Sequence, residues 1–439
     1  MIHAFQINDT NIVLDVNSGA VHVVDDNAYE LLSKMNEKST LTPFKELNMS
    51  AEYREAYDEM SKLSEAGMLF LPDYEINVSR NNTPIKALCL HVAHDCNLRC
   101  EYCFASTGEY HGKRELMTSE TAKKAIDFVV SNSQKRRNIE IDFFGGEPLM
   151  NFGVVKETVK YAKESGAKND KNFRFTITTN GMLLNDDNMQ FINEHMHNVV
   201  LSLDGRPEVN DKMRKTVTGK GCYDIILPRI LAAIKSRGDK SYYLRGTFTR
   251  HNLDFTNDVL HIAAQNIKCI SVEPVIGDES TKYAIQKEDI PAISAEYERL
   301  AEECLKNDFD FFHFNIDLDG GPCAIKRIAG CGAGLEYLAI SPSGDIYPCH
   351  QFVGNEEFNM GNICSGDYRR EISQRFAEVS VETKDACKNC WAKFFCSGGC
   401  HANAHSFNKD LNIPYEISCE LERKRVECSL YIATKKATS

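Results

Sequence analysis

A regular alternation of apolar runs and amphipathic stretches begins at Ile85 and ends near residue 310. Six runs rich in β-branched and aromatic residues have the pattern of strands, and each is followed by a stretch of helical periodicity, the last at about residues 289–307. The predicted strands are residues 86–93, 139–144, 173–179, 199–204, 242–248 and 269–275. Strands that alternate with helices form parallel sheets with right-handed crossovers. The pattern therefore predicts an α/β fold, a partial (βα)6 TIM-like barrel over residues 85–310.

The N-terminal residues follow a different pattern. Three short alternating runs, at residues 3–7, 11–16 and 20–24, are separated by the turn sequences NDT and NSG. One helix is expected to begin with Asp25 or Asp26 as its N-cap, and a second to cover residues 50–67. The polar stretch 76–84 is typical of a linker. We expect a small separate domain over residues 1–78.

Beyond about residue 315 the alternation stops, and cysteine, glycine and turn residues dominate as far as Cys419. Such a segment is hard to fold by hydrophobic burial alone, but a bound metal can supply folding free energy. We therefore expect a separate metal-binding domain over residues 315–439. The last twenty residues are expected to form a helix that ends in a frayed basic tail.

Composition narrows the function classes. A chain of 439 residues exceeds the usual size of one hydrophobic core, so two or three domains are expected. The net charge of −12 argues against a nucleic-acid partner. Because the sequence has neither a long apolar run nor an export signal, we expect no membrane partner and a cytoplasmic location. Seventeen cysteines in a reducing compartment indicate metal ligation rather than disulfides.

Three of these cysteines follow the first predicted barrel strand. Cys96, Cys100 and Cys103 have the spacing C-x3-C-x2-C. Three other strand ends carry glycine or polar sequences, GGEP at 145–148, TTNG at 178–181 and SLDG at 202–205. The C-terminal ends of barrel strands meet at one rim, where catalytic groups collect. Considered alone, the cysteines also suit a zinc site with a distant fourth ligand, or three unrelated core thiols.

With Tyr102 before the last cysteine, this spacing resembles the signature of the radical S-adenosylmethionine (SAM) superfamily. The resemblance implies that three thiolates bind three irons of a [4Fe-4S] cluster, whose fourth iron is left for the amino and carboxylate groups of SAM. The reduced cluster of that family cleaves SAM, and the resulting 5′-deoxyadenosyl radical abstracts a substrate hydrogen. The resemblance also assigns the SAM-binding residues: Tyr102, with Gly145, Gly146 and Glu147 at the amino group, Ser202 at the ribose and Arg214 at the carboxylate.

A second cysteine group lies near the C-terminus, and its seven thiols exceed the four that one zinc ribbon needs. Their spacing resembles the SPASM extension of radical SAM enzymes, which implies two auxiliary [4Fe-4S] clusters and three clusters in all. The implied ligands are Cys331, Cys349 and Cys400 for the first cluster, and Cys387, Cys390, Cys396 and Cys419 for the second.

The first auxiliary set is one thiolate short. Either Cys323 completes it, or the position stays open for a substrate thiolate. His350 follows Cys349 where sulfatase-maturating enzymes, another SPASM class, have an aspartate base; we expect a histidine that supports a ligand or lies at the surface. The remaining thiols are expected to be core or semi-buried: Cys89, Cys222, Cys269, Cys304, Cys364 and Cys428.

The N-terminal pattern is similar to the winged-helix module that binds leader peptides of ribosomally made, modified peptides. In such a module an edge strand pairs with the extended leader. The expected edge comprises Ala20, Val21, His22, Val23 and Val24. A simple capping domain is the alternative.

The order of the three modules resembles that of the maturases of SCIFF (six cysteines in forty-five) peptides. This implies thioether crosslinks installed in a cysteine-rich precursor peptide with a leader, and an external low-potential electron donor of the ferredoxin or flavodoxin type. The alternatives are a SPASM peptide dehydrogenase, such as a sulfatase-maturating (formylglycine-forming) or carbon-carbon crosslinking enzyme, and a non-catalytic iron-sulfur electron carrier.

Overall fold

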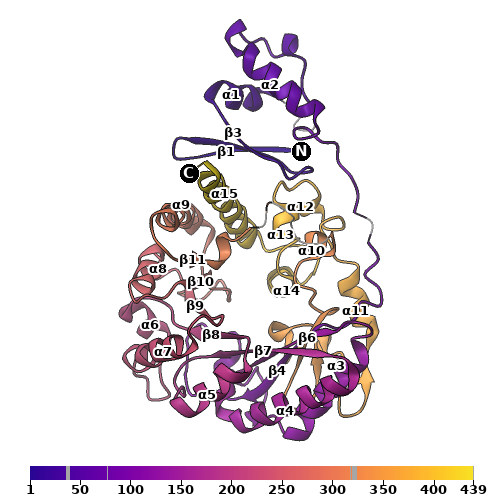
Figure 1. Ribbon diagram of the computed structural model, residues 1–439, viewed down its shortest axis with the longest axis vertical. Helices are drawn as coiled ribbons and strands as arrows, with labels where there is room; N and C mark the ends of the chain where they lie inside the picture. The colour runs from indigo at the N-terminus through magenta and orange to yellow at the C-terminus, as the bar shows by residue number, and fades with distance from the viewer. Residues whose placement is uncertain (36–39, 77, 317, 319–323, 439) are drawn as a thin grey trace.

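A computed structural model describes residues 1–35, 40–76, 78–316, 318 and 324–438. Its centre is a ten-stranded sheet in which six parallel neighbours form an incomplete barrel (Figure 1). The six strands are β4 (Ala87–His94), β6 (Asn138–Gly145), β7 (Asn172–Thr179), β8 (Asn198–Ser202), β9 (Tyr243–Phe248) and β10 (Cys269–Pro274). The predicted α/β fold is thereby confirmed, and each of the six strands lies where its apolar run was found.

Helices cover the outer face of these strands (Figure 1). They are α3 (Ser119–Asn132), α4 (Phe152–Asn169), α5 (Asp186–His195), α6 (Pro207–Met213), α7 (Tyr223–Arg237), α8 (Thr256–Ala263) and α9 (Ile290–Lys306). Their starts follow local rules. The side chain of Thr118 accepts a hydrogen bond from Thr121 N before α3, and Asn185 and Asn188 form a reciprocal capping box at α5. These caps satisfy backbone N–H groups in the first turn of each helix. The strand ends that precede the helices carry the candidate site.

The N-terminal residues form an antiparallel sheet in the order β1 (Ile2–Ile7), β2 (Thr10–Asp15), β3 (Val21–Val24). Helices α1 (Asp26–Lys34) and α2 (Arg54–Glu65) follow, and Asp25 caps α1 by accepting from Ala28 N. These elements confirm the three strands and two helices, although α2 begins four residues later than expected. Helices and sheet share a small hydrophobic cluster of their own. The boundaries of the three domains stay a prediction.

The C-terminal segment is less separate than the sequence suggested. Strand β12 (Tyr337–Ile340) pairs in parallel with β4, and β13 (Ile346–Tyr347) pairs with β12, so both extend the barrel sheet. The segment also contributes fully buried apolar side chains to the main core, among them Leu338, Phe358 and Phe376. Apolar burial therefore contributes to the folding of this segment, and its status as a separate domain stays a prediction. Its other elements are α10 (Ala324–Ala329), β14 (Gly361–Asn362), β15 (Asp367–Tyr368), α11 (Arg370–Ala377), α12 (Asp385–Lys388), α13 (Lys393–Cys396) and α14 (His401–Asn408).

The last helix, α15 (Glu416–Thr438), lies between the barrel and the N-terminal sheet (Figure 1). It packs against α9 on one side and against β1 and β3 on the other. Val426, Cys428 and Leu430 are buried in these contacts. The frayed tail predicted for this segment is therefore wrong, because the helix continues to Thr438. Within the described ranges, no helix has the length and apolarity needed to cross a membrane.

Candidate functional site

The loop after β4 carries Cys96, Cys100 and Cys103, all half-buried. Two donors point at the first sulfur: Leu98 N lies 3.4 Å and Asn180 Nδ2 lies 3.6 Å from Cys96 Sγ. Hydrogen bonds to a ligating sulfur are among the means by which proteins tune iron-sulfur clusters. The loop is thus already supplied with donors suited to a thiolate.

Glycines at the end of β6 allow this loop to pack closely. A Cβ on Gly145 would lie 2.2 Å from the Ala93 carbonyl oxygen, and one on Gly146 would lie 2.1 Å from that of Asp95. In this close approach Gly146 N donates to Ala93 O over 2.7 Å, and Glu147 N donates to Asp95 O over 2.9 Å. The structure thus gives both glycines a packing function, and their contact with SAM stays a prediction.

Glu147 joins two of the strand ends. Its fully buried carboxylate accepts from Leu149 N (3.0 Å), Thr179 Oγ1 (2.8 Å) and Asn180 N (2.8 Å). Burial raises the pKa of this carboxyl from 4.5 to about 7, although these hydrogen bonds oppose the shift. The sequence identified TTNG as a strand-end signal without giving it a function. Here Thr179 and Asn180 hold the carboxylate that the resemblance assigns to the amino group of SAM.

Tyr102, Asp204 and Arg214 form a buried polar cluster beside the cysteine loop. The Tyr102 hydroxyl donates to Asp204 Oδ2 (2.6 Å), and Arg214 Nη1 lies 3.3 Å from the same hydroxyl. Arg214 Nε is buried and has no hydrogen-bond partner among the described residues. An unpartnered guanidinium N–H suits a carboxylate ligand. Sequence reasoning chose Ser202, which is half-buried at the end of β8, and missed Asp204 two residues later in the same SLDG motif.

The three thiols of this loop influence one another electrostatically. Burial raises the pKa of Cys96 to about 11 and that of Cys100 to about 12, and the thiol of Cys103 adds to both shifts. Iron binds the thiolate form, so binding would release these protons. The grouped thiols and the unpartnered Arg214 N–H fit a cluster and a cofactor with a carboxylate. No group of three or more His, Cys, Asp or Glu side chains in the described residues could hold a single metal ion.

The division of the auxiliary cysteines into two ligand sets stays a prediction, and electrostatic interactions link some members of each set. Burial raises the pKa of Cys349, and Cys400 and Cys331 raise it further. In the second set, burial raises the pKa of Cys396 to about 12, with Cys419, Cys387 and Cys390 adding to the shift. Cys349 and Cys396 are thus each influenced by thiols of their own predicted set. Cys323, the alternative fourth ligand of the first set, lies outside the described residues.

His350 is half-buried between the barrel and the C-terminal segment. Its ring lies 5.8 Å from Phe104 and 5.3 Å from Phe144, and its Nδ1 lies 3.2 Å from the Tyr337 hydroxyl. Burial lowers its pKa to about 4, so the imidazole is neutral at pH 7. The surface position, one of the two expected for this histidine, is therefore wrong.

A pair of buried histidines on the first barrel strand was also missed. His91 Nδ1 lies 3.2 Å from His94 Nε2, and the His91 Nε2 atom has no partner in the part of the chain that the structure describes. His91 stands in the apolar run that predicted β4 and His94 directly follows that run, so neither residue was recognised as part of a buried polar pair.

The expected leader-binding edge corresponds to β3, which begins at Val21, one residue after Ala20. The strand is terminal in its sheet and pairs only with β2 among the described strands. Val23 is 53% exposed, and the ring of His22 contacts the Met68 carbonyl. Its terminal position is compatible with strand addition.

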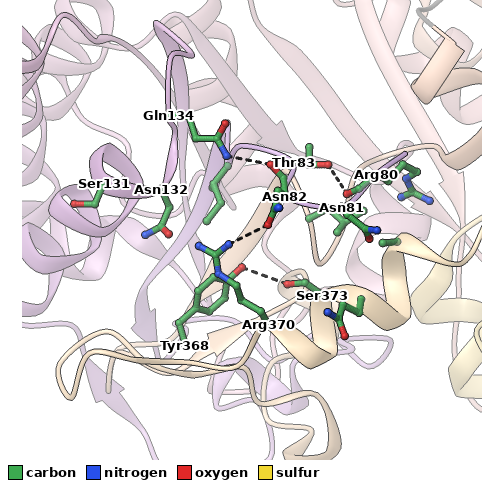
Figure 2. Close-up of a pocket in the computed structure, with 14 residues that line it drawn as sticks. Arg80, Asn81, Asn82, Thr83, Ser131, Asn132, Gln134, Tyr368, Arg370 and Ser373 are labelled. Carbon is green, nitrogen blue, oxygen red and sulfur yellow. Dashed lines mark hydrogen bonds between the residues drawn. The ribbon is translucent and has the colours of Figure 1, made fainter. Parts of the chain in front are cut away.

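A polar pocket elsewhere lies between the linker, α3 and α11 (Figure 2). In it Gln134 Nε2 donates to the Asn82 carbonyl (3.0 Å) and Arg370 Nη1 to the Asn82 side chain (3.4 Å). None of the residues predicted to bind a cluster or SAM lines it. Its hydrogen bonds hold the linker against the barrel and the C-terminal segment.

Comparison with known proteins agrees with this geometry. Residues 86–226 match a family described as a 4Fe-4S single cluster domain, and residues 331–391 match SPASM, an iron-sulfur cluster-binding domain. A cysteine-type anaerobic sulfatase-maturating enzyme of Clostridium novyi is 25% identical over 342 residues, 73% of this chain and 87% of that protein. The radical SAM cyclopropyl synthase TigE of Paramaledivibacter caminithermalis is 24% identical over 418 residues, 87% of this chain and 84% of that protein.

Among solved structures, native anSMEcpe with bound AdoMet and Cp18Cys peptide superposes with a TM-score of 0.66 at 19% identity. The match covers 81% of this chain and 99% of that one, and at this identity it establishes the fold. The chain thus matches a 4Fe-4S single cluster domain and a C-terminal SPASM domain, is similar in sequence to a radical SAM enzyme, and has the α/β fold of anSMEcpe.

Proposed function

We propose that the protein installs intramolecular thioether crosslinks, from a cysteine sulfur to a carbon, in a ribosomally made cysteine-rich precursor peptide. One observation supports this most. Phe104 directly follows Cys103, is 46% exposed, and lies 5.8 Å from His350, which directly follows Cys349. This contact supports a short distance between the proposed SAM-site loop and Cys349 of the first auxiliary set, which would let one bound peptide reach both. Such proximity replaces a bimolecular encounter with a positioned one.

The residues at the SAM site and those beside the first auxiliary set have different proposed roles. When bound at Cys96, Cys100 and Cys103, the [4Fe-4S] cluster and SAM supply a 5′-deoxyadenosyl radical. Arg214, with its unpartnered Nε, binds and orients the carboxylate of SAM, and Tyr102 and Asp204 hold the guanidinium in place. The neutral ring of His350, beside Phe104 and Phe144, presents an uncharged surface at this contact, and the charges of Arg245 and Glu273 also act on the ring. Such a surface would help to orient one substrate position for reaction.

The auxiliary sets complete the proposal. We assign Cys331, Cys349 and Cys400 to one [4Fe-4S] cluster and the other four thiols to a second, three clusters in all, reduced by a ferredoxin- or flavodoxin-type donor. The position left open in the first set, unless Cys323 fills it, would bind the peptide cysteine as a thiolate. Formation of each ring removes two hydrogens from the peptide. The 5′-deoxyadenosyl radical would take a hydrogen atom from the acceptor carbon, the thiol would lose a proton, and the remaining electron would pass to the first auxiliary cluster.

Leader recognition is proposed for the edge of β3, in a domain of residues 1–78 that precedes the barrel (85–310) and the SPASM domain (315–439). Tethering by a leader raises the effective concentration of the core peptide at the site. A Val23→Lys substitution should weaken peptide binding roughly tenfold, since lysine on an edge discourages strand addition. Val217→Lys is the matched control, because Val217 is 61% exposed in a barrel loop.

The decisive experiment incubates the reconstituted protein anaerobically with SAM and a cysteine-rich precursor peptide encoded beside its gene. The expected product is lighter by two hydrogens per ring and has lost the corresponding alkylatable thiols. A peptide that loses two hydrogens while its cysteines remain alkylatable would favour the dehydrogenase alternative, which the likeness to the Clostridium novyi enzyme also supports. Protein that does not cleave SAM under dithionite would point to an electron carrier.

A further inference from the structure

Lys384 is a fully buried lysine that lies just before α12. Its Nζ donates to the carbonyl oxygen of Gly398 over 2.6 Å. Lysine is almost never fully buried unless it is paired, and an uncharged carbonyl is a weak partner for an ammonium. The charge must therefore be balanced by something besides this hydrogen bond.

The carbonyl that it contacts lies in the loop that joins the two auxiliary cysteine sets. This loop runs from Cys396 of the second set to Cys400 of the first. Its three intervening residues, Ser397, Gly398 and Gly399, all have positive φ, of 58°, 88° and 72°. Only Ser397 has a Cβ that makes this conformation costly, and the two glycines leave the loop many other conformations, so selecting this conformation requires a fixed partner. The hydrogen bond from Lys384 supplies one at its midpoint.

Lys384 is also tied to the other side of the second set. Its backbone carbonyl accepts from Cys387 N over 2.9 Å, which places it next to the first thiol of α12. The Gly398 carbonyl that Nζ contacts lies midway between Cys396 of the second set and Cys400 of the first. One ammonium therefore lies on the segment that both proposed clusters share.

We propose that Lys384 is a positioning residue whose buried positive charge is shared by the two auxiliary sites, holds the Cys396–Cys400 loop, and raises the reduction potentials of both clusters. The proposal rests on the function above only in taking both sets as iron-sulfur sites. Reduction adds a negative charge to a cluster, and a nearby cation in a region of low dielectric stabilises the reduced form.

The test compares three substitutions in the full-length protein reconstituted with iron and sulfide. Lys384→Met removes both the charge and the hydrogen bond, Lys384→Gln keeps a donor without the charge, and Lys384→Arg keeps the charge. The matched control is Lys393→Met. Lys393 is a second buried lysine of this segment, 7% exposed, and donates to the Lys388 carbonyl over 3.2 Å. Midpoint potentials are read from redox titrations followed by electron paramagnetic resonance, without peptide.

Both neutral variants should shift both auxiliary potentials to more negative values, whereas Lys384→Arg and Lys393→Met should shift them little. The SAM-site cluster serves as an internal reference and should not move. Wild-type potentials in Lys384→Gln, or a shift confined to one auxiliary cluster, would overturn the proposal. If the neutral variants lose their auxiliary iron while Lys384→Arg retains it, the result supports a need for the positive charge. Loss of auxiliary iron in all three variants would overturn the proposal. Because no peptide is present, the result does not depend on thioether formation.

Discussion

The two cysteine-bearing regions are held in place by different means. The first set comes from one loop at residues 96–103, and neighbouring strand ends support it through Gly146, Glu147 and Asn180. The auxiliary thiols are spread over residues 331–419, and their support includes isolated contacts such as that of Lys384 with Gly398. We therefore expect the barrel to shape its site before iron binds, and the auxiliary sites to depend more on the iron itself.

The surroundings of two glycines illustrate the difference. A Cβ at Gly146 would meet backbone at 2.1 Å, whereas one at Gly398 would meet nothing closer than the Val381 side chain at 3.5 Å. The barrel rim is packed so tightly that no residue with a Cβ fits at position 146. In the auxiliary loop there is room, and only the backbone conformation favours glycine.

The largest expected effect is the loss of SAM cleavage when the first cysteine set is removed. A Cys96/Cys100/Cys103 to alanine variant should no longer cleave SAM, yet should stay folded and keep its auxiliary iron, because the sheet does not depend on these thiols. Formation of 5′-deoxyadenosine, iron content and circular dichroism measure the three properties. Cys364→Ser is the control, since Cys364 is exposed and outside all three sets. Unfolding of the triple variant would contradict the difference between the two regions.

The second expected effect concerns pH. The pKa of Glu147 is raised from 4.5 to about 7, so the folded state favours the protonated carboxyl. The protonated Glu147 carboxyl therefore stabilises the folded state. This stabilisation is fully present below pH 4.5 and is lost as pH rises through 7, a change of about 3 kcal/mol in the free energy of unfolding. The difference between wild type and Glu147→Gln, measured by denaturant titration of the apoprotein from pH 4 to 8, should show this slope. If the free energies of unfolding of the two proteins depend on pH in the same way, the raised pKa of Glu147 is refuted.

A smaller effect is expected for Arg214→Gln. Loss of a hydrogen bond to a charged ligand costs about 1.5–3 kcal/mol, so the affinity for SAM should fall roughly 10- to 100-fold. Calorimetric titration of the reconstituted protein measures it. Arg229→Gln, at an exposed arginine of α7, should bind as wild type does. An unchanged affinity for SAM would show that Arg214 stabilises the protein and does not bind SAM.

The smallest effect is expected at the auxiliary loop. Gly398→Ala should lower the free energy of unfolding by about 1–2 kcal/mol, the cost of a left-handed conformation. Gly219→Ala should cost as much, since Gly219 has a φ of 79° and a Cβ added there would meet no atom within 4 Å. Only Gly398→Ala should also reduce auxiliary iron, measured by metal analysis. Equal iron in both variants would mean that the loop tolerates the change.

Sequence reasoning recovered the barrel because each strand is a long apolar run followed by an amphipathic helix, as in β4 and β7. It missed β12, whose four residues are too few to display a period, and whose partner β4 lies far away in the chain. Asp204 and the hydrogen bonds of Glu147 were missed for a related reason. Their partners are distant in sequence, and an ordinary LDG or GEP turn carries no sign of them.

Helix α15 connects two parts of the molecule that are far apart in sequence. It contacts β1 and β3 as well as α9, and Ile12 and Leu14 of β2 join the main core. Because the 23 residues of α15 follow both parts along the chain, the N-terminal sheet keeps one apolar face uncovered during synthesis until residues 416–438 have been made.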